Sequence, residues 1–130
     1  MRLRIRLSRD GESFIARLSP YHADVLHRAL TCLRARQRGD TALAVQVGAG
    51  AKAVDALAAR LAGDHARSFD LRLSAAEVHV LHSALTAAPL MFLDGRDRLF
   101  SEELFHRETG SFREHFDALA RSLVEEVSKA

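Results

Sequence analysis

Residues 14–31 and residues 69–86 of the chain resemble each other when they are aligned at a constant offset of 55. Ten of these eighteen aligned positions are identical, where about one or two identities would arise by chance. A second match, at an offset of 62, relates residues 48–61 to residues 110–123. The two matches predict an internal duplication in which the second copy carries an insertion of seven residues between its matched blocks.

Turn and cap signals predict a strand followed by a helix in each copy. Asp10-Gly11 is a hairpin signal between two segments in which apolar and polar residues alternate. Ser19-Pro20 places a helix cap and a first-turn proline before the apolar stripe of the first copy. Ser74-Ala-Ala-Glu77 is a capping box before the corresponding stripe of the second copy, and Ser111-Phe-Arg-Glu114 is another near the end of the chain.

The second half of each copy is ambiguous, because Leu43-Ala-Val-Gln-Val47 suits either a strand or a helix by periodicity. Its counterpart, Phe105-His-Arg-Glu-Thr109, alternates and is too polar for a core helix, so we predict that both segments are strands. The chain is then one α+β domain of two layers, with a sheet of about five strands that carries about four helices. The predicted parts of this single domain, residues 1–130, are an N-terminal strand at 2–7, a first βαβα copy at about 14–62 and a second βαβα copy at about 69–127.

The composition is that of a globular protein, with 48% apolar and 28% charged residues. No apolar run approaches the ~20 residues that a membrane span needs, and residues 1–7 alternate charged with apolar side chains, unlike a secretory signal. Cys32 is the only cysteine, which excludes an intramolecular disulfide. We therefore expect a cytoplasmic protein, and the use of 17 arginines against two lysines indicates a GC-rich, bacterial genome.

The alternation of the predicted strands places basic side chains on one face of the sheet and apolar side chains on the other. If all the helices cover the apolar face, the uncovered face carries five arginines: Arg2, Arg4, Arg6, Arg17 and Arg72. Such a surface attracts anions and would suit nucleic acid or an acidic protein partner. The alternative is that exposed strand positions carry charge for solubility and to protect strand edges. No aromatic residues interleave these arginines, as stacking RNA readers require.

No motif predicts a cofactor, a metal ion or a catalytic centre. Gly48-Ala-Gly-Ala-Lys-Ala53 follows a predicted strand and opens a predicted helix, which is the setting of a dinucleotide-binding turn. Asp70, about twenty residues on, falls at the start of its strand instead of the far end, so we interpret the segment as a simple helix entry. His79 and His82 share a helix face without a third ligand, and Cys32 sits at the edge of an apolar stripe, where a thiol packs.

Three functional hypotheses follow from this reading, and the first is favoured because the sequence shows no coherent catalytic site. It is a non-catalytic protein that binds another macromolecule, through protein–protein interaction of an inhibitor, immunity or regulatory type or through self-association. The second is nucleic-acid binding through the arginine face, with affinity that falls steeply as salt rises. The third is a small-molecule enzyme or sensor that uses a cleft between the two copies.

Overall fold

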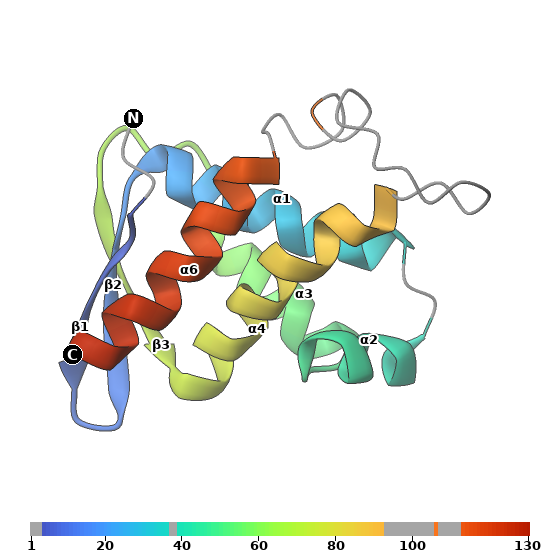
Figure 1. Cartoon of the computed structure of the whole chain (residues 1–130), viewed down its shortest axis with the longest axis horizontal. Coiled ribbons are helices and arrows are strands. Elements are labelled where there is room, and N and C mark those ends of the chain that lie inside the picture. The colour runs from blue at the N-terminus through green and yellow to red at the C-terminus, as the bar shows by residue number, and fades with distance from the viewer. Residues whose placement is uncertain (1–3, 37–38, 93–105, 107–112) are drawn as a thin grey trace.

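The computed structural model describes residues 4–36, 39–92, 106 and 113–130, which form an α+β fold (Figure 1). An antiparallel hairpin leads into three α-helices and a third strand, after which the described residues form an α-helix, a 3₁₀ helix and a last α-helix. In chain order the elements are β1 (Arg6–Asp10), β2 (Ser13–Leu18), α1 (Pro20–Arg36), α2 (Asp40–Val47), α3 (Ala51–Leu61), β3 (Phe69–Ser74), α4 (Ala75–Ala87), the 3₁₀ helix η1 (Ala88–Phe92) and α6 (Arg113–Lys129).

The sheet has the strand order β1-β2-β3, and both neighbouring pairs are antiparallel. The predicted hairpin is confirmed, and Gly11 takes the positive φ of 64° that its turn requires. The strand predicted at 2–7 lies later, at Arg6–Asp10. Its start is set by β2, because Arg17 pairs with Arg6 and β2 ends at Leu18, just before the proline that opens α1.

The helices pack on one face of the sheet, where the apolar side chains of the three strands are buried or half-buried. Phe14, Ala16 and Leu18 of β2 and Leu73 of β3 lie in one core with the apolar stripes of the helices. α1 contacts α3 and α4, α4 contacts α6, and α6 contacts β1 (Figure 1). This is the two-layer arrangement that alternating strands and amphipathic helices favour.

Two side chains of α6 accept hydrogen bonds from backbone N–H groups at the outer edge of β1. The backbone N–H of Ile5 donates to Ser122 Oγ at 3.2 Å, and that of Leu7 donates to Glu126 Oε1 at 3.4 Å. The spacing suits both elements, because residues two apart point the same way on a strand and residues four apart share a helix face. The last helix therefore covers the edge strand that begins the chain.

The predicted number of strands is wrong, because the described residues form three strands and five α-helices. Residues 43–47 belong to helix α2, which buries Leu43 and Val47 and leaves Val45 84% exposed. Burial four residues apart is the helical pattern, whereas a strand would have buried Val45 on the same face. The other predicted strand, residues 105–109, lies outside the described residues except for His106, which is helical.

The predicted duplication of a whole βαβα unit is not supported by the structure. Strand and capped helix do follow each other in β2–α1 and in β3–α4, as the first match predicts. After α1, however, the chain continues with two helices, α2 and α3, where the duplicated unit required a strand and a helix. The structural similarity between the two copies is therefore established only for the strand and the helix of the first match, β2–α1 and β3–α4.

The predicted helix entries are confirmed where the structure describes them. The Ser74 side chain accepts from the Glu77 N–H at 3.1 Å, and Glu77 Oε1 accepts from the Ser74 N–H at 2.8 Å. Residue 111, which begins the other predicted capping box, lies outside the described residues. Within the described part of the chain no single helix is both long and apolar enough to cross a membrane; only α2 and α3 together reach that length and composition, bent by 63° at their junction.

Candidate functional site

Three of the five predicted arginines lie together on the solvent side of the sheet. Arg6 pairs in register with Arg17, and Arg72 lies on the same face, one pleat further along the strands. All three are exposed. Arg4 precedes β1 and extends toward α6, while Arg2 lies outside the described residues.

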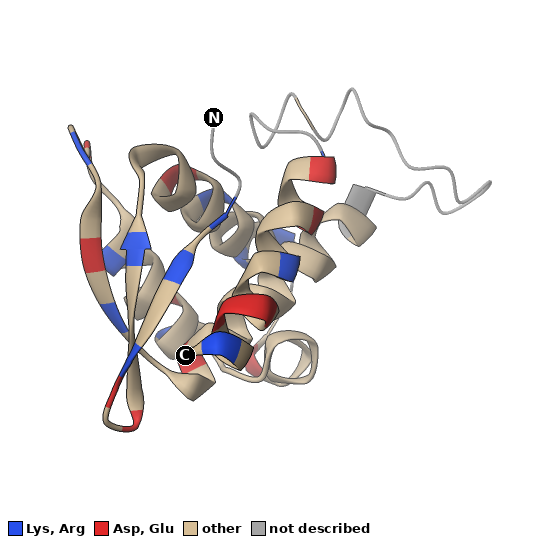
Figure 2. Ribbon diagram, turned by 60° about the vertical axis from the view of Figure 1, so that its left-hand side comes forward, with Lys and Arg blue, Asp and Glu red and all other residues tan. Residues whose placement is uncertain are grey.

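Carboxylates pair with most of these arginines. Arg17 Nη1 lies 3.1 Å from Asp70 Oδ1, and Arg72 forms an ion pair with Asp10. Basic and acidic positions consequently mix across the three strands (Figure 2). Arg6 is the exception, because its side chain forms no hydrogen bond or ion pair with any residue that the structure describes. A face of paired charges offers a phosphate backbone a much weaker field than five unpaired arginines would.

Arg4 forms an ion pair with Glu126 and so joins the segment before β1 to α6. Its Nε and Nη2 atoms donate to Glu126 Oε2 at 2.9 and 2.6 Å, while Oε1 of the same carboxylate accepts from Leu7. The bond from Arg4 outweighs the desolvation of the carboxylate, so the pKa of Glu126 is lowered. Between α1 and α3, the hydrogen bond between Arg34 and Asp55 raises the arginine pKa and lowers the aspartate pKa. These shifted groups lie in ion pairs that join elements of the fold.

The glycine-rich turn at residues 48–53 connects two helices, because it follows α2 and not the strand that we predicted. The Asp40 carboxylate accepts a hydrogen bond from the Ala51 N–H at 2.9 Å, at the first turn of α3. It therefore occupies the position at which a helix N-terminus would bind the pyrophosphate of a dinucleotide. The turn uses Asp40 to join the two helices.

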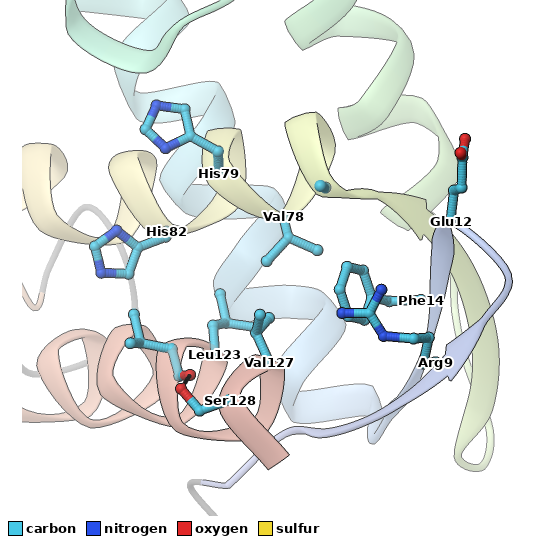
Figure 3. A pocket seen from close by; sticks show the side chains of 11 residues that line it. Arg9, Glu12, Phe14, Val78, His79, His82, Leu123, Val127 and Ser128 are labelled. Atoms are coloured by element: carbon cyan, nitrogen blue, oxygen red, sulfur yellow. Dashed lines mark hydrogen bonds between the residues drawn. The ribbon is translucent and has the colours of Figure 1, made fainter. Parts of the chain in front are cut away.

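A groove of about 470 Å³ lies between the β1–β2 hairpin, α4 and the C-terminal half of α6. Phe14, Val78, Leu123 and Val127 converge on it from these three elements (Figure 3). Val124 adds an apolar side chain that is 53% exposed. The floor of the groove is thus formed by apolar side chains of the core, and its wall by apolar surface that remains in contact with water.

Polar side chains surround this apolar floor. The Arg9 guanidinium carbon lies 5.0 Å from the centroid of the Phe14 ring, within cation–π distance. His79 and His82 project from α4 at the other end of the groove, and Ser128 projects from α6 (Figure 3). His79 is exposed and His82 is half-buried. Among the described residues no three His, Cys, Asp or Glu side chains gather as a metal ion would require.

No pattern in the sequence predicts this groove. Leu123 and Val127 are spaced to share one face of a helix, and so are His79 and His82, but spacing alone cannot bring α4, α6 and the hairpin together. Val124 gives the one available signal, because it is an apolar residue outside the helical spacing that relates Leu123 to Val127.

Comparison with known proteins finds no protein-family model, no curated protein and no solved structure that matches the chain.

Proposed function

We propose that this protein binds another protein, and that the groove between the hairpin, α4 and α6 receives apolar side chains of the partner. The observation that carries the proposal is an apolar floor open to solvent beside the half-exposed Val124. Protein interfaces combine such an apolar centre with a polar rim that supplies both donors and acceptors. Arg9, His79, His82 and Ser128 form a rim of this kind.

A glutamate at position 124 tests the proposal, because it places a charge against the floor of the groove while the half-exposed site keeps it in water. The tagged chain captures partners from a lysate of the organism that encodes it, in parallel runs with and without nuclease. The wild-type chain is expected to retain a stoichiometric partner, and V124E is expected to lose at least tenfold of it. A loss of this size corresponds to about 1.4 kcal/mol of binding free energy.

Val45 provides a matched control, since it is an even more exposed valine on α2 and does not line the groove. V45E should retain the partner as the wild-type chain does. A photo-reactive residue should crosslink to the partner from position 124 and not from position 45. Equal retention by V124E and the wild-type chain would contradict the proposal for the groove. Partners that disappear with nuclease would favour nucleic-acid binding through the strand arginines instead.

A small apolar ligand is a second candidate occupant, because the groove has the size and lining of many small-molecule sites. The capture experiment, together with a melting-temperature measurement, distinguishes this ligand from a protein partner. A chain that captures no protein, but whose melting temperature rises with a small ligand in the wild type and not in V124E, would bind that ligand in the groove.

A further inference from the structure

The two edges of the sheet differ in what covers them. At the β1 edge, Ser122 and Glu126 of α6 accept hydrogen bonds from the outward-pointing N–H groups of Ile5 and Leu7. At the other edge, the backbone carbonyl of Arg72 accepts a hydrogen bond from the Arg60 side chain. This contact shows that the carbonyl points away from β2. Successive residues of an antiparallel strand alternate in direction, so Asp70 also presents its backbone N–H and C=O outward. β3 is the last strand of the sheet (Figure 2). The pairing groups of Asp70 and Arg72 are therefore directed away from β2, toward an edge that no strand occupies among the described residues.

We propose that the β3 edge binds a second copy of this chain, and that the two β3 strands pair antiparallel about a twofold axis at Leu71. This register places Asp70 of each copy opposite Arg72 of the other. Both residues direct their backbone groups outward, so they can exchange two hydrogen bonds, as directly opposed residues of an antiparallel ladder do. Two three-stranded sheets would become one sheet of six strands.

Charge complementarity selects a second copy as the occupant. Asp70 and Arg72 stand two residues apart on one exposed face, and an antiparallel partner strand with the reverse order of charges faces both with opposite signs. The strand itself has that order when it is turned about Leu71. Asp70 would then lie between Arg17 of its own copy and Arg72 of the other, in a row of alternating charge.

The face toward the helices supports the same register. Phe69 and Leu71 pack against the core but remain half-buried, unlike Leu73, which is fully buried. Leu71 would meet its symmetry mate as a non-hydrogen-bonded pair, in which side chains approach most closely. Association would cover apolar surface that the single copy leaves in contact with water.

Arg60 limits this association. Its Nη1 atom lies 2.6 Å from Glu77 Oε2, while Nη2 donates to the Arg72 carbonyl that the second copy would use. A charged side chain that covers an open strand edge is one way in which proteins prevent unwanted strand pairing. Removing it in R60A should increase dimer affinity, whereas a guanidinium with a purely structural role would leave the affinity unchanged.

Charge reversal tests the register in the full-length chain, by sedimentation equilibrium over a wide range of concentrations. The wild-type chain is expected to dimerise reversibly. D70R and R72D each place two like-charged pairs across the axis, and we expect each to weaken the dimer at least about tenfold. An equimolar mixture of D70R and R72D is expected to form heterodimers, and the double variant D70R/R72D is expected to restore the homodimer.

R121D is the control, since it makes the same charge change at an exposed residue of α6 and should leave the dimer unchanged. The reversed residues take part only in well-exposed ion pairs within one copy, so the variants should fold, which circular dichroism checks. A wild-type chain that stays monomeric at every concentration overturns the proposal, as does a dimer that neither single reversal weakens. The groove shares no residue with this edge, so V124E should dimerise normally.

Discussion

At the scale of single residues, His22 does for α1 what Glu77 does for α4. The Ser19 N–H donates to His22 Nδ1 at 3.1 Å, and the His22 N–H donates back to Ser19 Oγ at 3.1 Å. This is the reciprocal geometry of a capping box, with an imidazole nitrogen as the acceptor. It requires the ring to carry its neutral-state proton on Nε2. The helix cap predicted at Ser19 is therefore confirmed, and His22 completes it.

We predict that His22→Ala lowers the free energy of unfolding by about 2 kcal/mol, because it removes the acceptor of the Ser19 N–H and a buried ring, although the backbone N–H at this position can still donate to Ser19 Oγ. His22→Gln, which keeps an acceptor of similar reach, should recover a substantial part of that loss. Urea denaturation monitored by circular dichroism measures both. Equal destabilisation by the two substitutions would assign the effect to packing alone and contradict the capping role.

At the scale of elements, the sequence predicts α1, α4 and the hairpin correctly because each has explicit start and stop signals. The error at residues 43–47 has an equally local cause. Leu43, Val45 and Val47 alternate perfectly, and the assignment to a strand rested on a counterpart in the assumed second copy. Stronger evidence was present at both ends of the segment, since Asp40 lies in the first turn of α2 and Gly48 follows its last residue.

Gly48 carries a prediction for the α2–α3 junction. Its φ of 80° is in the left-handed region, and a Cβ added there would lie 3.0 Å from His79 Cδ2. Gly48→Ala should therefore cost about 1–2 kcal/mol of backbone strain and a further cost for displacing the imidazole ring. Urea unfolding checks this against Gly11→Ala, which has similar strain and open space around it.

A double-mutant cycle separates the two costs. In a His79→Ala background the steric part of the Gly48→Ala penalty should vanish, and the penalty should fall to that of Gly11→Ala. An unchanged penalty would show that the ring does not restrict this turn.

At the scale of the whole molecule, strand alternation was enough to predict that arginines would gather on the open face of the sheet. The sequence could not predict their partners, because these depend on register and on helix docking. The β2–β3 register places Asp70 opposite Arg17. Glu126 contacts Arg4 although the two residues are 122 positions apart in the sequence. The groove is a product of the same long-range packing. No local motif encodes these surfaces, because long-range packing assembles them.

The contact between α6 and β1 gives the molecule an acid dependence that can be measured. The pKa of Glu126 is lowered in the folded state, so its contribution to stability is complete above the unfolded-state pKa of about 4.3. That contribution disappears as the pH falls through the lower folded-state pKa. We predict that Glu126→Gln reduces the free energy of unfolding by about 1 kcal/mol at neutral pH, since Arg4 is half exposed and the pair is partly screened.

Urea unfolding from about pH 7 to about pH 3 should show the difference between the wild-type chain and Glu126→Gln shrinking toward zero on the acid side. Glu125→Gln is the matched control, because that exposed carboxylate has no hydrogen bond or ion pair to a described residue. It should change stability little at any pH. A penalty for Glu126→Gln that persists unchanged at about pH 3 would mean that Glu126 holds the edge strand by shape and not by charge. The ionised pair with Arg4 would then not be what joins the two ends of the chain.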